Sequence, residues 1–167
     1  VTSTTSGIPI KLMNEGRSDD FKKYFARTHF FNPPRYLNLF EVVPGPDCNK
    51  DVLDFLLEYG EKFLGKTSVL AKDTPAFIGN RIGIFGIMSL FHQIKNGEYS
   101  VEEVDKLTGP AIGRPKSATF RTADIAGLDT MCHVANGVYD KCKDDELREV
   151  FKLPDFLQRM LDNNMLG

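Results

Sequence analysis

The chain has 167 residues, of which 41% are apolar and 26% are charged, and its formal net charge is −2 at pH 7. These values are typical of a globular, soluble protein and exclude a disordered chain, which combines low hydrophobicity with high net charge. Because 21 basic residues nearly balance 23 acidic ones, no strong positive field is present, and we expect no nucleic-acid partner.

The sequence predicts neither export nor a membrane span. No basic segment followed by an apolar core opens the chain. The longest apolar stretch, residues 76–94, is interrupted by Asn80, Arg81, His92 and Gln93, and such polar groups are costly inside a bilayer. We therefore expect a protein that is not secreted and has no membrane partner.

Strand and helix signals alternate over the first seventy or so residues. Pro33 and Pro34 separate two strand-like segments, because proline fits neither a helix interior nor the middle of a sheet. The expected elements are a strand at 1–6 ending in a turn at Gly7, a short helix within 14–25 capped by Ser18, strands at 27–31 and 37–43, a helix at 50–64 between Asn49 and Gly65, and a strand at 67–71. This order is typical of the trailing part of an α/β domain.

From Asp73 onward, the signals are helical. Asp73 as a capping residue and Pro75 in the first turn predict a long helix that closes at Gly97. Three glycines lie near one face of this helix, which would let another backbone approach closely: Gly79, Gly83 and Gly86. Further helices are expected after a capping box at 100–103 and at residues 117–126, 129–142, 145–152 and 155–163. The predicted fold class is α+β, with a boundary near residues 70–75.

A histidine and a glutamate occur in the two strands that flank the prolines. If these strands pair antiparallel about Arg35, His29 lies opposite Glu41 and Phe30 lies opposite Phe40, so that each pair shares a face of the sheet. A carboxylate beside an imidazole fixes its tautomer and raises its basicity, as a general base near neutral pH requires. The alternative is an ordinary polar pair, and a shift of one residue in the pairing would separate the two groups.

Other polar residues are weaker candidates for a site. Ser6 stands at the predicted end of a strand, before a glycine, where it either contacts a ligand or caps a turn. Asn80 lies early in an apolar helix and either lends its amide to a ligand or belongs to the helix start. His92 and His133 are interpreted as packed or solvated helix residues. The three cysteines lack metal-ligand or redox spacing, which predicts free thiols in a reducing compartment and no metal site.

Several segments together resemble the L-3-hydroxyacyl-CoA dehydrogenases of fatty-acid β-oxidation. HFFNPPRYLNLFEVV resembles that family's H-F-F-N-P segment and the strand after it, and TSTTSGIPI resembles its serine-rich strand end. KDTPAFIGNRI is similar to the family's K-D-T-P-G-F-I-x-N-R helix start, and ADIAGLDT to its D-x-x-G-L-D segment. The matches follow the family's order and spacing across nearly the whole chain.

The resemblance implies a fold and a set of roles. Residues 1–72 would be the C-terminal part of a Rossmann-type NAD-binding domain, and residues 73–167 a helical substrate and dimerisation domain like the C-terminal domain of 6-phosphogluconate dehydrogenase. His29 would be the base that takes the proton of the 3-hydroxyl of an acyl-CoA substrate, and Glu41 would orient it. Ser6 and Asn80 would bind around the reacting oxygen, while Asn32, together with Ser6, would lie near the NAD nicotinamide. The family also implies a homodimer through the helical domain.

The sequence departs from the family pattern in several places. The chain starts at Val1 rather than Met and contains no G-x-G-x-x-G turn, so we expect a fragment that binds NAD weakly by itself. Where many members read P-M-G-P-F, this chain carries RPKSATFR, whose basic residues either meet a CoA phosphate or belong to a solvated helix start: Arg114, Lys116 and Arg121. This variant resembles members in which an enoyl-CoA hydratase region is fused to the dehydrogenase.

Two alternative functions remain open at this point. The first is another β-hydroxyacid dehydrogenase on the same scaffold, of the L-gulonate type, which would keep His29 and Glu41 but lose affinity for CoA. The second is a non-catalytic binding or dimerisation module. For either dehydrogenase, the expected location is the bacterial cytoplasm or the mitochondrial matrix.

Overall fold

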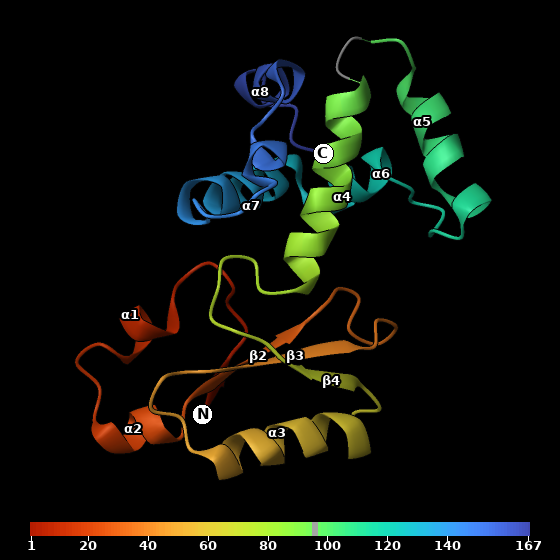
Figure 1. The fold of residues 1–167 in the computed structure, drawn as a ribbon. Coiled ribbons are helices and arrows are strands. Elements are labelled where there is room, and N and C mark those ends of the chain that lie inside the picture. The colour runs from red at the N-terminus through yellow and green to blue at the C-terminus, as the bar shows by residue number, and fades with distance from the viewer. Residues whose placement is uncertain (95–96) are drawn as a thin grey trace. The chain divides into compact units, whose positions relative to one another are not determined.

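The computed structural model describes residues 1–94 and 97–167, which form two compact units, Val1–Asn80 and Arg81–Gly167. The first unit contains, in chain order, β1 (Thr2–Ser3), α1 (Ile10–Asn14), α2 (Asp19–Lys23), β2 (Ala26–Phe30), β3 (Leu39–Pro44), α3 (Lys50–Lys62) and β4 (Thr67–Leu70). The predicted α+β class is confirmed, although α1 was not expected from the sequence (Figure 1).

The first unit is built on one sheet with the strand order β1-β2-β3-β4. β1 and β2 are parallel, β2 and β3 are antiparallel, and β3 and β4 are parallel. In the antiparallel pair, His29 lies opposite Glu41 and Phe30 lies opposite Phe40, which confirms the predicted register. The two candidate side chains therefore share one face of the sheet.

The two faces of this sheet carry different layers. Ala26, Phe40 and Val42 pack together with Leu56 of α3, which covers one face (Figure 1). Residues at the alternate positions of the central strands belong to the other face, where an apolar cluster comprises Ile10, Phe25, Val43, Ala71 and Phe77. Because side chains alternate along a strand, the same alternation puts His29 and Glu41 on the face away from α3.

Helix α3 approaches the sheet closely at one glycine. A Cβ added at Gly60 would lie 2.3 Å from the Ser68 Oγ and 2.6 Å from the Phe40 ring. Gly60 is therefore required by packing, although glycine weakens a helix interior. The predicted side-chain cap by Ser18 is confirmed for α2, whereas Asn49 makes no side-chain cap hydrogen bond in α3.

The segment that connects β4 to α4 (Gly79–Ile94) is not helical at its start. Ala76 and Phe77 have left-handed φ values of 63° and 47°, and the N–H of Phe77 closes a turn on the carbonyl oxygen of Thr74 at 3.0 Å. The prediction that the helix begins around Pro75 is therefore wrong: α4 begins at Gly79. Lys95 and Asn96, near the expected helix end, lie outside the described residues.

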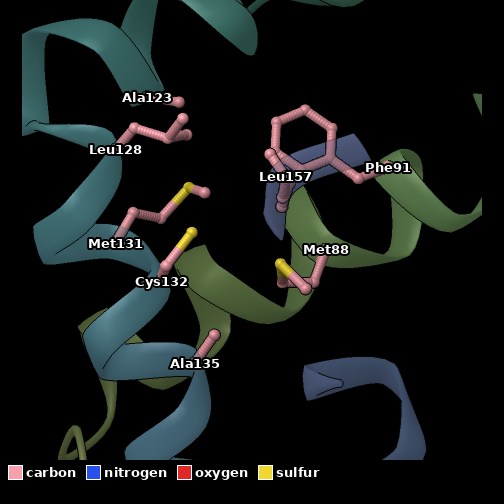
Figure 2. Packing of buried hydrophobic residues seen from close by; sticks show 8 residues of the cluster. All are labelled: Met88, Phe91, Ala123, Leu128, Met131, Cys132, Ala135 and Leu157. Carbon is pink, nitrogen blue, oxygen red and sulfur yellow. The ribbon is translucent and has the colours of Figure 1, made fainter. Parts of the chain in front are cut away.

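The second unit is helical. After the first two residues of α4, it contains α5 (Val101–Thr108), η1 (Pro110–Ile112), α6 (Phe120–Ala126), α7 (Leu128–Lys141), η2 (Arg148–Phe151) and α8 (Asp155–Asp162). Its core packs side chains of α4 against α7 and α8, and Figure 2 labels the fully buried members: Met88, Phe91, Ala123, Leu128, Met131, Cys132, Ala135 and Leu157. Every helix among the described residues is too short or too polar to cross a membrane.

Two helix predictions in the second unit need correction. The helix expected from residue 117 begins at Phe120, because Ala118 is left-handed and the carboxylate of Asp105 accepts from the N–H groups of Thr119 and Phe120. The helix expected at 145–152 is a single 3₁₀ turn, η2. The capping box of α5, formed by Ser100 and Glu103, is confirmed.

Among the described residues of each unit, no backbone approaches the glycine face of α4 closely. A Cβ at Gly79 would collide with the Phe31 ring, at 2.4 Å, rather than with a backbone. Among the described residues of its unit, no atom lies within 4 Å of a Cβ added at Gly83, and one added at Gly86 would meet the Arg114 guanidinium at 3.9 Å. Within each unit, Gly79 and Gly86 therefore lie next to side chains, whereas the helix surface at Gly83 is uncovered.

Candidate active site

The pair formed by His29 and Glu41 is the centre of the candidate site. The Nδ1 of His29 lies 2.7 Å from the Oε2 of Glu41, and the carboxylate fixes Nδ1 as the protonated nitrogen by accepting from it. Nε2 makes no hydrogen bond with any described residue, so this nitrogen can accept a proton from a ligand. His29 is 8% exposed and Glu41 is fully buried.

Glu41 is held by three donors. Besides His29, the backbone N–H groups of Ile78 and Gly79 donate to its Oε1 at 2.9 and 2.8 Å. Burial by itself would raise the pKa of Glu41, but the hydrogen bonds from His29, Gly79 and Ile78 outweigh it and lower the pKa below its ordinary value. Glu41 therefore stays ionised at neutral pH, as an orienting carboxylate must.

Two aromatic rings pack against the imidazole of His29. Phe31 contacts it edge-on with ring centroids 4.8 Å apart, and Phe77 contacts it at 5.4 Å in a similar perpendicular arrangement. Phe31 continues from β2, whereas Phe77 comes from the left-handed segment before α4. The two perpendicular ring contacts restrict the orientation of the imidazole.

The remaining predicted site residues lie in the same unit. Ser6 is partly buried in a bend three residues after β1, and Asn32 is exposed two residues after β2. Because β1 and β2 are parallel, both residues follow the carboxyl ends of neighbouring strands. Asn80, partly buried, directly follows Gly79, which donates to Glu41. Among the described residues, no hydrogen bond joins any of the three to His29 or Glu41.

Several contacts at the site were not predicted from the sequence. The N–H groups of Ile78 and Gly79 carry no side-chain signal, so their role depends on the fold. Phe77 and the ion pair of Arg27 with Asp73 were also missed. The Asp-Thr-Pro sequence at residues 73–75 is a turn signal that could have indicated a sharp bend before the helix.

The other polar and thiol groups considered as possible sites do not form a metal site or a reactive nucleophile among the described residues. Among the residues that the structure describes, no three His, Cys, Asp or Glu side chains gather as metal ligands. Burial raises the pKa of the Cys132 thiol to about 11, with a further contribution from Asp129, so this thiol is not a nucleophile at neutral pH. Arg114, Lys116 and Arg121 are exposed on the second unit.

Fold and site together define a class of protein. The first unit is a sheet-and-helix domain with a buried His–Glu pair, and the second is helical. Residues 1–74 match the sequence model described as "3-hydroxyacyl-CoA dehydrogenase, NAD binding domain", and residues 77–167 match "3-hydroxyacyl-CoA dehydrogenase, C-terminal domain". The chain therefore belongs to the 3-hydroxyacyl-CoA dehydrogenase family.

Individual relatives are similar along the whole chain. A "Probable 3-hydroxyacyl-CoA dehydrogenase" of Bacillus subtilis is 54% identical over 167 residues, which are all of this chain and 21% of that protein. One of the same name from Deinococcus radiodurans is 45% identical, also over all of this chain and 47% of its own length. The crystal structure of M. tuberculosis FadB2 has a TM-score of 0.85 and 26% identity, covering 99% of this chain and 56% of that one. The chain thus spans less than half the length of the Bacillus subtilis and Deinococcus radiodurans relatives.

Proposed function

We propose that the protein containing this chain is an NAD-dependent L-3-hydroxyacyl-CoA dehydrogenase that oxidises L-3-hydroxyacyl-CoA to 3-oxoacyl-CoA in fatty-acid β-oxidation. The observation that carries the proposal is the buried pair of His29 and Glu41, in which Nδ1 is fixed by the carboxylate and Nε2 has no hydrogen-bond partner among the described residues. Membership of the family supports the substrate class and the cofactor.

In this proposal, His29 moves the proton. Its Nε2 accepts the proton of the substrate's 3-hydroxyl, and the imidazolium that forms is stabilised by Glu41 across the 2.7 Å hydrogen bond. Because Glu41 is itself held by the N–H groups of Ile78 and Gly79, it does not need to reorganise when the charge appears. In the reverse direction, His29 returns the proton as a general acid.

Residues of this chain fit the nicotinamide end of a bound dinucleotide. Ser6 and Asn32 follow the carboxyl ends of the parallel strands β1 and β2, which is where α/β sheets bind nucleotides. We assign both to cofactor contacts, and Ser6 with Asn80 to hydrogen bonds around the reacting oxygen and His29. When bound there, NAD supplies the acceptor for the hydride that leaves C3 of the substrate.

We also propose that the chain comprises two domains with different roles. Residues 1–72 belong to the NAD-binding domain, and residues 73–167 form a helical substrate and dimerisation domain. At Gly83, no atom of the described residues in the second unit lies within 4 Å of an added Cβ, and this uncovered surface of α4 supports a homodimer contact on the helix. The exposed Arg114, Lys116 and Arg121 are candidates for contact with a CoA phosphate.

A fused enoyl-CoA hydratase region completes the proposal. This chain accounts for 21% of the length of its Bacillus subtilis relative, so that protein has room for a further enzyme domain. We place the protein in the bacterial cytoplasm or the mitochondrial matrix, where β-oxidation of this kind would operate.

The catalytic assignment is tested by His29→Gln and Glu41→Gln in the full natural chain that contains these residues. Each change should lower kcat for acetoacetyl-CoA reduction by about 10²- to 10⁴-fold, because a group that acts in the transition state is lost. KM should change little, since neither residue is needed to bind the substrate in its ground state. Steady-state kinetics with NADH absorbance measure both constants.

A matched control is His133→Gln, the same substitution at an exposed histidine of α7. Its kcat should equal that of the unmodified protein. Near-normal turnover in either His29→Gln or Glu41→Gln would refute the catalytic roles. Free 3-hydroxy acids should be poor substrates beside the CoA thioesters, and the opposite preference would favour a different β-hydroxyacid dehydrogenase.

A further inference from the structure

A buried arginine lies on the same face of β2 as His29, two residues away. Arg27 is 1% exposed, and its Nη1 donates to the Oδ1 of Asp73 at 3.1 Å. The other carboxylate oxygen of Asp73 accepts from the backbone N–H of Ile10 at 2.7 Å. Asp73, the residue that opens the segment before α4, is thus tied to two different elements.

The same guanidinium contacts the ring that bounds His29. The Cζ of Arg27 lies 5.4 Å from the centroid of the Phe77 ring, and that ring lies 5.4 Å from the His29 imidazole. Phe77 therefore packs against both side chains. A shift of Phe77 would remove one of the two rings that orient the imidazole.

The backbone around Phe77 needs support from its surroundings. Ala76 and Phe77 both have left-handed φ values, which side chains other than glycine adopt at a cost and keep only where neighbouring contacts hold them. One end of the segment is held by the contacts of Asp73. The other end is held by Ile78 and Gly79, whose N–H groups bind Glu41.

We propose that Arg27 is a positioning residue, which fixes the segment 73–79 through Asp73 and Phe77 and thereby sets the orientation of His29 and Glu41. One strained segment then supplies both a ring against His29 and the two N–H donors for Glu41. Arg27 touches neither substrate nor cofactor in this role. The kinetic part of the inference rests on the proposed dehydrogenase function, but the geometric part does not.

The test uses Arg27→Met in the full natural chain. Methionine keeps the apolar volume and leaves Asp73, which is 26% exposed, able to reach water, whereas a change at Asp73 would strand a buried guanidinium. We expect kcat to fall by roughly 10- to 100-fold, because a small displacement of a catalytic base is costly, with KM within about twofold. The low-field proton resonance of the His29–Glu41 hydrogen bond, assigned by its absence in His29→Gln, should shift or broaden.

Three further variants test the individual contacts of this series. Phe77→Leu keeps an apolar side chain but removes the ring, so it should lower kcat and perturb the resonance; it also decides the question if Arg27→Met does not fold. Adding Ala76→Gly to Arg27→Met should restore several-fold of the lost kcat, since glycine adopts a positive φ without strain. Arg27→Lys, which retains the charge opposite Asp73, should keep a higher kcat than Arg27→Met.

The controls separate positioning from stability. Lys50→Met breaks an exposed ion pair with Asp54 on α3 and should leave kcat and the resonance unchanged. A folded Arg27→Met or Phe77→Leu enzyme with normal kcat and an unchanged resonance overturns the proposal, even if it melts at a lower temperature. An unmodified protein that is inactive on 3-hydroxyacyl-CoA would instead refute the proposed function, while the resonance would still decide the role of Arg27.

Discussion

At the scale of single residues, Glu41 shows how a buried charge is tolerated. Its two oxygens accept three hydrogen bonds, two of them from backbone N–H groups whose positions the fold fixes. These bonds favour the ionised form more strongly than burial disfavours it, so the pKa of Glu41 in the folded chain lies below its ordinary value. Ionised Glu41 thus stabilises the fold as well as orienting His29.

This pKa shift predicts a pH dependence of stability. Because the folded pKa is depressed, the contribution of Glu41 is fully present above the unfolded value of about 4.3 and is lost as pH falls through the folded value. Glu41→Gln should therefore lower the free energy of unfolding at pH 7, and the difference from the unmodified chain should shrink below pH 4.3, roughly. Urea unfolding of residues 1–167 between pH 7 and pH 3 measures this, and a difference that stays constant with pH would contradict it.

At the scale of elements, the contact of α3 with the sheet depends on a glycine, Gly60, which has no side chain. Gly60 lets the helix lie against Phe40 of β3 and Ser68 of β4, and the Ser68 hydroxyl donates to the carbonyl oxygen of Leu57 at 2.8 Å. Helix periodicity in the sequence predicted α3, but it did not indicate how close the helix lies to the strands. The distance between α3 and the sheet is set by the side chains of β3 and β4 that the helix packs against.

We expect Gly60→Ala to destabilise the chain, although alanine is the better helix former by about 1 kcal/mol. The added methyl would collide with Phe40 and Ser68, and such overpacking costs about 1–3 kcal/mol in addition to a lost hydrogen bond of about 1 kcal/mol. Gly137→Ala in α7 is the matched control: among the described residues of that unit, no atom lies within 4 Å of the added methyl, so it should stabilise by about 0.5–1 kcal/mol. Equal effects of the two changes in urea unfolding would refute the packing argument.

At the scale of the whole molecule, our proposal gives this chain one end of a nucleotide site. Ser6 and Asn32 follow parallel strands as a nicotinamide contact requires, but none of the 167 residues forms a G-x-G-x-x-G turn to bind the pyrophosphate. The chain matches the family's NAD-binding domain over residues 1–74.

Residues 1–167 alone should bind NAD with a Kd above about 1 mM, because the pyrophosphate contributes much of the binding energy in such domains. Isothermal titration calorimetry measures this value. The full natural chain, titrated under the same conditions, provides the comparison. A micromolar Kd for residues 1–167 would contradict the prediction and indicate a different nucleotide site.

The sequence by itself predicted strands at residues 27–31 and 37–43, which the structure has at Ala26–Phe30 and Leu39–Pro44, whereas the pairing of His29 with Glu41 depended on assuming an antiparallel pair about Arg35. The strand-like segments and the two prolines between them were sufficient to predict the strands, because the restriction that proline imposes on the backbone is local. The sequence also gave enough ordered motifs to identify the family. The roles proposed for Ser6, Asn32 and Asn80 remain predictions.

The tertiary structure alone decided what surrounds the pair. Local signals placed a helix start at Pro75, whereas contacts of Asp73 with Arg27 and of Ile78 and Gly79 with Glu41 impose a left-handed turn there. Propensity describes a segment in isolation, but these contacts join residues more than thirty positions apart, and their energy outweighs the local preference. The backbone donors that hold Glu41 have no signature in the sequence, since every residue except proline carries an N–H group.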